Sequence, residues 1–279
     1  MTNIFIAEHD QIFALLSKWI LRQLTSEQLS WLRQKQQQIA SDSSGRALFF
    51  AFSAVSRFIG KENLQLEETD IQELAKENIC WFPQYWTMDR AVRIWLLLSF
   101  AFNSQEQYSK VIKQLFDTAD VRELTALYQA LPFLPNPQKH YYIATEGVRS
   151  NMTDVFNAIS LYNSYPAAYF DELAWNQMVL KALFVGSPLY MIQGLEQRAN
   201  LALAKMLVDY AHERWVANRS ISPELWQIVG RFVDTATFAK IGKVFNATHR
   251  FGKAEGSPKE FPYPKVYPLG SVKAALKDS

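Results

Sequence analysis

Cysteine is almost absent from this sequence of 279 residues, in which Cys80 stands alone. A single cysteine excludes an intramolecular disulfide framework and any multi-cysteine zinc or iron–sulfur site. It is typical of a protein in a reducing compartment. The surrounding stretch, ENICWFPQYW, is aromatic and supplies no base or positive charge to activate the thiol. We therefore expect Cys80 to be a packed core residue rather than a nucleophile.

Glycine and proline are also few, with 10 and 11 copies. Sandwiches, barrels and doubly wound α/β folds need many turns and are therefore disfavoured. The longest apolar runs, ALFFAF and IWLLLSFAF, are far shorter than the ~20 residues of a membrane-spanning helix. The N-terminal stretch lacks the basic and apolar regions of a signal peptide, and the basic residues form no run that favours nucleic-acid binding. We expect a soluble, cytoplasmic protein.

Helical periodicity with helix-start signals runs through the chain. The stretches 25–28 and 120–123 are capping-box patterns. Gly60 is placed as a C-cap glycine, and Pro223 is placed at a first helical position. We predict an all-α fold of about eleven or twelve helices, without a fixed sequence period, that forms an irregular α-solenoid or helical-repeat bundle over residues 1–249 as one domain.

Two of the predicted helices are long, whereas the end of the chain is predicted to be extended rather than helical. The helix over 166–185 is apolar nearly all round, which predicts a buried central helix, and a second long helix covers 195–218. Residues 250–279 are rich in proline, which predicts an extended arm. The arm either straps over the domain or docks a partner, through the aromatic residues Phe251, Phe261, Tyr263 and Tyr267.

Known catalytic and metal-binding motifs are incomplete. His212–Glu213 begins like the zinc-protease pattern H-E-x-x-H, but Val216 takes the place of the second histidine. Asp209 and His212 have the spacing of one ligand pair of a di-iron site, which needs a second such pair. None of the other histidines can supply that second pair, because none has an acidic residue three positions earlier. These histidines are His9, His140 and His249. We expect no metal and no cofactor, and no catalytic residue is assigned.

Polar residues on the two long helices suggest a pocket. At 100° per residue, Arg214 and Trp215 fall on the apolar arc of the helix over 195–218, and Asn200 and Glu196 fall on the same arc. A buried arginine must be paired, either with a structural carboxylate or with an anionic ligand. The candidate ligand-binding residues are Arg149, Asn163, Asn176, Lys181, Asn200, Arg214 and Trp215. Such groups also serve helix ends in a solenoid, so both interpretations remain open.

The runs LPFLP, RSNMTDVFNAISLYNSYPAAYFDELAWNQMVLKALFVG and GLEQRANLALAKMLVDYAHERWVANRSISPELWQIVG lie within residues 131–230. Together they resemble the EboA-like family. The chain departs mildly from the family pattern at two places. Residues 163–166 are NSYP where the family has Asn-Pro-Tyr-Pro, and residues 216–219 are VANR where the family has two small residues followed by Gly-Arg. The resemblance implies an operon for metabolite traffic, with enzyme-like partners and a prenyltransferase-like membrane protein, which moves secondary-metabolite precursors out of the cytoplasm. It supplies no catalytic residue.

Three functions are consistent with these observations. The first is a non-catalytic cytoplasmic helical adaptor or carrier that hands a small-molecule metabolite, or a partner enzyme, to a membrane component. The second is an all-α enzyme that acts on an aromatic or isoprenoid-like metabolite. The third is a structural interaction scaffold without a ligand pocket. The resemblance favours the first, and the lack of an acid/base pair counts against the second.

Overall fold

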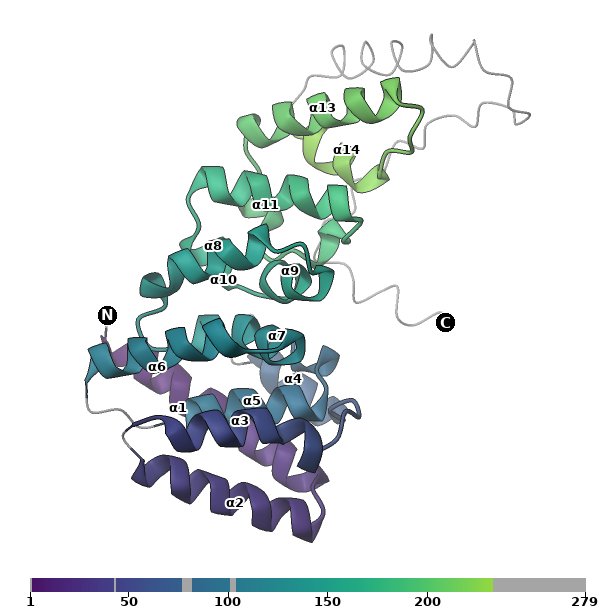
Figure 1. The fold of residues 1–279 in the computed structure, drawn as a ribbon. Helices are drawn as coiled ribbons and strands as arrows, with labels where there is room; N and C mark the ends of the chain where they lie inside the picture. Colours follow the sequence, from purple (N-terminus) through teal and green to yellow (C-terminus); the bar gives the residue numbers. More distant parts are fainter. Residues whose placement is uncertain (1, 43, 77–81, 101–103, 233–279) are drawn as a thin grey trace. The chain divides into compact units, whose positions relative to one another are not determined.

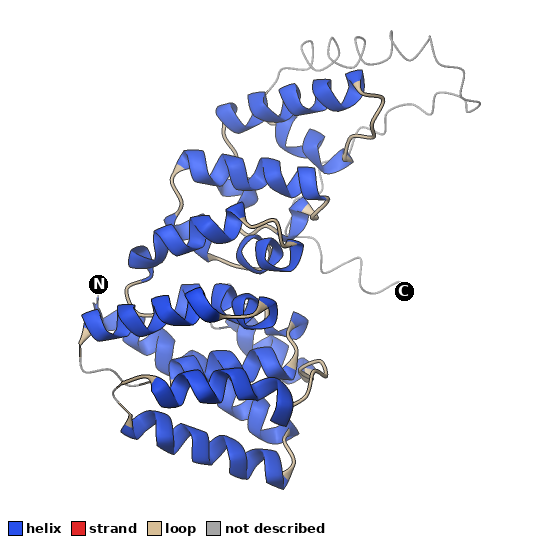
Figure 2. Cartoon of the chain, in the orientation of Figure 1, coloured by secondary structure: helices blue, strands red, loops and turns tan. Residues whose placement is uncertain are grey.

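The protein is described here by a computed structural model (Figures 1 and 2). The residues that it describes are 2–42, 44–76, 82–100 and 104–232. Within these ranges the elements are α-helices and short 3-10 turns without a strand, and one antiparallel bridge joins Asn63 to Thr87. The predicted all-α class is confirmed.

The chain divides into two compact units, Met1–Asp171 and Glu172–Ser279. A single domain over residues 1–249, and its solenoid character, therefore stay predictions. Cys80 and the arm expected over 250–279 lie outside the described residues.

The first unit is organised around α5 (Met88–Leu98). Helices α1, α3 and α7 pack against α5, while α2 packs on α3, and α9 contacts both α7 and α8. The bounds of the other elements are α1 Thr2–Gln23, α2 Ser26–Ser41, α3 Arg46–Phe58, α4 Glu68–Lys76, η1 Pro83–Tyr85, α6 Gln105–Thr118, α7 Val121–Ala130, η2 Leu131–Phe133, η3 Pro137–His140, α8 Tyr141–Arg149, α9 Thr153–Ser160 and α10 Tyr165–Tyr169.

An ion pair lies inside α5. Ten of the eleven residues of this helix are buried, and they include Asp89 and Arg93. The Arg93 Nη1 donates to Asp89 Oδ2 at 2.8 Å, its Nη2 to Ser56 Oγ at 2.7 Å and its Nε to the Phe52 carbonyl at 3.2 Å. Burial alone would raise the pKa of Asp89, but hydrogen bonds from Thr87 and Arg93 lower it. The guanidinium therefore joins α5 to α3 with every nitrogen bonded.

A second carboxylate joins α1 to α4. Asp70 is buried, and its Oδ2 accepts from Arg22 Nη2 at 2.6 Å, while Lys18 Nζ lies 3.3 Å from its Oδ1. Burial would raise the pKa of Asp70, but the hydrogen bonds from Arg22 and the Glu67 backbone N–H, together with the nearby Lys18 ammonium, outweigh it and lower the pKa to about 2. Asp70 therefore stabilises the fold chiefly in its charged form.

The helix-start signals of the sequence are present in the structure. Thr25 and Asp120 each begin a helix with a complete capping box. Pro223 occupies the first position of its helix, and Gly60 has a left-handed φ of 88° just after α3. These predictions are confirmed, because each depends on residues within one helical turn.

The two long helices of the sequence are both interrupted. The helix predicted over 166–185 becomes α10 and α11 (Glu172–Val185), because Phe170 is extended, with ψ of 142°. The helix predicted over 195–218 becomes α12 (Leu195–Arg198) and α13 (Leu201–Val216), because Asn200 is extended, with φ of −144°. The second unit also contains η4 Leu189–Met191 and α14 Pro223–Val229.

The packing of the second unit centres on α11 and α14. Helix α13 contacts both of them, and so does the η4 turn. The Glu224 carboxylate of α14 accepts the Leu189 N–H at 2.8 Å, which holds η4 in place. The sequence predicts Glu196 and Arg214 on one arc of a continuous helix over 195–218. Because the helix breaks at Asn200, these two residues lie on different helices, and the 100° spacing no longer relates them.

We expect Arg93→Met to lower the free energy of unfolding of the first unit by about 3–5 kcal/mol, because it leaves the Asp89 charge buried without its partner. Urea unfolding followed by circular dichroism measures this. The control Arg57→Met, at an exposed position of α3, should change the value by less than about 0.5 kcal/mol. A loss below about 1 kcal/mol for Arg93→Met would contradict the buried pair.

Because of Asp70, the free energy of unfolding should depend on pH in the acidic range. The folded pKa of Asp70, about 2, lies below the unfolded value of about 3.9. The stabilisation is therefore complete above pH ~4 and is lost as the pH falls from ~4 towards ~2. We expect about 1–2 kcal/mol in this window, because solvent screens the half-exposed Arg22 and Lys18. Urea titrations of the wild type and Asp70→Asn should converge at low pH, and a constant difference would contradict the assignment.

Candidate functional site

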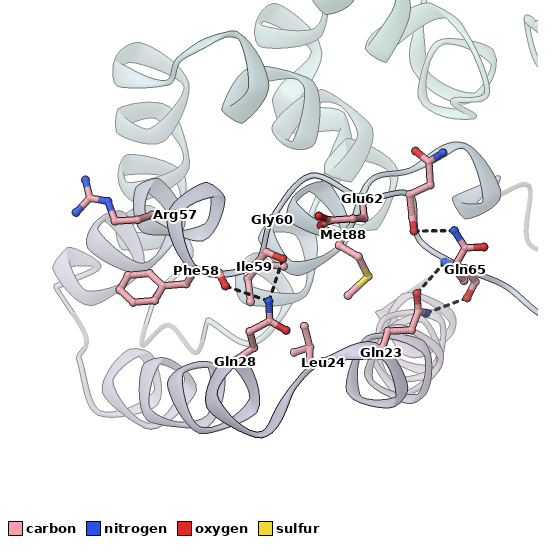
Figure 3. A pocket seen from close by; sticks show the side chains of 11 residues that line it. Gln23, Leu24, Gln28, Arg57, Phe58, Ile59, Gly60, Glu62, Gln65 and Met88 are labelled. Atoms are coloured by element: carbon pink, nitrogen blue, oxygen red, sulfur yellow. Dashed lines mark hydrogen bonds between the residues drawn. The ribbon is translucent and has the colours of Figure 1, made fainter.

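A surface pocket of about 620 Å³ lies in the first unit, where the α1–α2 turn faces the end of α3 (Figure 3). The Gln28 Nε2 donates to the carbonyls of Phe58 and Ile59 at 3.2 Å each, while its Oε1 accepts the Thr25 N–H at 2.9 Å. One amide thus caps two helices. The pocket is lined by Gln23, Leu24, Gln28, Arg57, Phe58, Ile59, Gly60, Glu62, Asn63, Gln65 and Met88.

Gln23 is bonded in the same way as Gln28. Its Oε1 accepts the Gln65 N–H at 2.8 Å, and its Nε2 donates to the Gln65 carbonyl at 2.8 Å. The side chain therefore pairs with the Gln65 backbone as a strand would. The amides of Gln23 and Gln28 already hold the chain together, so we do not assign a ligand to this pocket. The sequence indicated the cap at Gln28 but not its bonds to α3, which involve residues about thirty positions away.

The pair Asn176–Asn200 is the part of the predicted pocket that the structure brings together. Asn176 Nδ2 donates to Asn200 Oδ1 at 3.2 Å, and Asn200 Nδ2 donates to Asn176 Oδ1 at 2.9 Å. The Asn200 Oδ1 also accepts the Leu203 N–H at 2.8 Å, which caps α13. The buried Asn176 on α11 thus finds its partner in a helix cap. The two amides satisfy one another and join two helices.

Arg214 does not reach this pair. It lies fourteen residues after Asn200, or about 20 Å along the axis of α13. Its Nε and Nη2 donate to the Ser220 carbonyl at 3.0 and 2.9 Å, which holds the chain that leaves the helix. Trp215 is half-buried, and its ring centroid lies 5.9 Å from that of His212. The expected interior around Arg214, Asn200 and Asn176 is therefore not found.

The remaining predicted site residues have separate surroundings. Arg149 is exposed, and its Nη1 lies 2.6 Å from Glu146 Oε1. Asn163 is buried and donates to the carbonyls of Tyr128 and Ala158 at 2.9 Å each. Arg149 and Asn163 belong to the first unit, and the other five predicted residues belong to the second. A ligand-binding role for the seven stays a prediction.

One side of α11 is apolar and exposed, where the sequence predicts burial on all sides. Leu173 is 70% exposed and Phe184 is 73% exposed. At 100° per residue, Gln177 and the half-buried Leu180 fall between them on the same stripe. The half-buried Lys181 borders it, and burial lowers the pKa of its ammonium. We call these five residues, Leu173, Gln177, Leu180, Lys181 and Phe184, the α11 stripe.

A metal site or a membrane-spanning helix would each reduce the number of functions that the protein could have. No group of three His, Cys, Asp or Glu side chains that would suit a metal ion occurs in the described part of the chain. Across the same ranges, no helix combines the length and the apolar character needed to cross a membrane.

Comparison with known proteins places the chain in a family. The family model described as "Metabolite traffic protein EboA" matches residues 12–230, most of the chain. The protein belongs to the EboA family. No curated protein and no solved structure matches.

The EboA match begins well before residue 131, where the resemblance seen in the sequence starts. Nearly all of the first unit therefore belongs to the family pattern, together with the second unit up to Gly230. The buried pair of α5 and the α11 stripe both lie within the EboA match.

The Asn176–Asn200 pair gives a prediction for the second unit. Asn200→Ala should lower its free energy of unfolding by about 2–3 kcal/mol, because α13 loses its cap and the Asn176 amide loses its partner. Asn151→Ala, at an exposed asparagine, should cost less than about 0.5 kcal/mol. Hydrogen exchange should show faster exchange at the start of α13 in Asn200→Ala alone, and equal protection in both variants would argue against the pair.

Proposed function

We propose that this EboA-family protein is a non-catalytic helical adaptor or carrier in metabolite traffic. In this role it acts in the cytoplasm and receives a small-molecule metabolite, or an enzyme encoded in the same operon. It then presents this cargo to a membrane component, such as a prenyltransferase-like protein. The family match supports the link to metabolite traffic, and the α11 stripe is the observation that favours an adaptor.

The stripe has the form of a helix-docking surface. Leu173 and Phe184 lie eleven residues apart on one line of α11, with Leu180 between them, which matches the anchor spacing used when a second helix packs alongside. Large apolar side chains at the centre of an interface contribute most of the binding energy. Exposing two of them on one line costs free energy in the isolated protein, which a partner recovers by covering them.

The apolar anchors indicate the partner's chemistry. Leu173 and Phe184 are exposed and lie on one line of α11, so a partner that covers them presents a complementary apolar face. We therefore propose that the occupant is an amphipathic helix of a partner protein that packs its apolar face on the α11 stripe. A segment of the same chain on this face is the competing outcome.

Replacing the anchors should abolish partner binding without unfolding the protein. We expect the variant Leu173→Glu/Phe184→Glu to bind the operon-encoded partners at least about tenfold more weakly, since the two anchors together are worth more than about 1.4 kcal/mol. Its melting temperature should stay close to that of the wild type. Pull-down with purified partners and calorimetry measure both quantities.

The matched control for this experiment is Tyr142→Glu, because Tyr142 on α8 is 70% exposed but belongs to the first unit. It should leave partner binding unchanged. Equal binding by the wild type and the α11 variant would overturn the docking role. A lower melting temperature of the α11 variant, without partners present, would show instead that the chain itself covers the stripe.

A further inference from the structure

Arg90 occupies an unusual position in the first unit. It is the one residue of α5 that is not buried, so its side chain leaves the central helix where that helix reaches the surface. The end of the side chain is still largely enclosed, because its Nε is inaccessible to solvent. A guanidinium in such surroundings needs hydrogen-bond partners to compensate for lost hydration.

The hydrogen bonds of Arg90 are far fewer than those of its neighbour. Arg93 bonds through all three nitrogens, to a carboxylate, a hydroxyl and a carbonyl. Among the described residues, the Arg90 side chain has a single bond, from Nη1 to the Gln129 Oε1 at 3.3 Å, and its Nε has no partner. Since a guanidinium carries five N–H donors, most donors of Arg90 have no hydrogen-bond acceptor among the described residues.

A second arginine lies next to the same carboxylate. Arg122 at the start of α7 is half-exposed, and its Nη1 lies 3.5 Å from Asp89 Oδ2. Asp89 is already bonded to Arg93 at 2.8 Å and to the Thr87 hydroxyl, so it neutralises only one arginine well. Arg122 therefore brings a second incompletely neutralised guanidinium to the α5–α7 surface, on the helix that also carries Gln129.

The charges around Arg90 leave a positive excess. Burial lowers the pKa of Arg90, the carboxylates of Asp89 and Asp154 oppose this effect, and Arg122 and Arg93 add to it. Three arginines thus face two carboxylates, and Asp154 is exposed at the start of α9. A bound anion would restore the balance and supply the acceptors that the guanidinium lacks.

We propose that Arg90 and Arg122 form a binding site for an oxyanion, the phosphate or carboxylate group of a small molecule, with the amide of Gln129 beside it. Arginine suits this role because its planar fork binds two oxygens of such a group at once. The site lies in the first unit and does not depend on the adaptor proposal, which concerns α11. It gives the protein a means of holding an acidic metabolite.

The test uses the full chain and inorganic phosphate. Phosphate should raise the melting temperature of the wild type in a saturable way, relative to sodium chloride at the same ionic strength. Isothermal titration should show that Arg90→Met binds phosphate at least about tenfold more weakly, with a smaller loss for Arg122→Met. The control Arg149→Met removes an exposed arginine of the same unit that pairs with Glu146, and it should bind like the wild type.

Two further measurements separate ligand binding from a structural role. Without phosphate, Arg90→Met should melt at or above the wild-type temperature, because it removes a partly enclosed charge that has few hydrogen bonds. Arg90→Lys keeps the charge but loses the fork, so it should bind phosphate more weakly than the wild type. Acetate in place of phosphate identifies the group: equal stabilisation indicates carboxylates, and a response to phosphate alone indicates phosphoryl groups.

Several results would overturn the site. One is an identical effect of phosphate and chloride on the wild type, and another is phosphate binding that Arg90→Met retains. Failure of Arg90→Met to fold would also count against it, because it would show that Arg90 is a structural partner rather than an under-bonded group. In that case Arg122→Met, which changes a half-exposed side chain, still measures whether phosphate binds here.

Discussion

The ion pair between Asp89 and Arg93 is the interaction on which the first unit depends. It lies in the most buried helix, against which α1, α3 and α7 pack, so a charge left unpaired there would oppose all of that packing at once. The Arg93 guanidinium stacks over the Phe52 ring at 5.6 Å and binds the Phe52 carbonyl. Position and orientation of α3 on α5 are thereby set by directional bonds as well as by apolar contact.

The second unit uses neutral amides for a similar purpose. Asn176 is buried in α11, and Asn200 stands where α12 has ended and α13 begins. Each amide satisfies the other, and Asn200 also caps α13. An asparagine buried alone would oppose folding, whereas this pair makes the helix break itself a point of attachment between α11 and α13.

The functional proposals rest on groups that these structural pairs do not use. Arg90 and Arg122 stand beside a carboxylate that Arg93 already occupies, and the α11 stripe lies on the side of its helix away from its buried residues. We propose that one face of the first unit binds an acidic small molecule and that one face of α11 binds a protein helix. The amide-lined pocket of Figure 3 belongs instead to the framework.

The sequence by itself determined the all-α class, the family and the places where most helices begin. Capping boxes such as Thr25–Gln28 act within one turn, so local sequence contains everything they need. Tertiary structure alone decided the breaks at Phe170 and Asn200. The Phe170 ring packs edge-on against Tyr141 and Tyr165, and Asn200 turns to a partner on another helix. Apolar periodicity cannot show whether a face meets a neighbour, which is why the exposed side of α11 and the under-bonded Arg90 emerge only when the helices are packed.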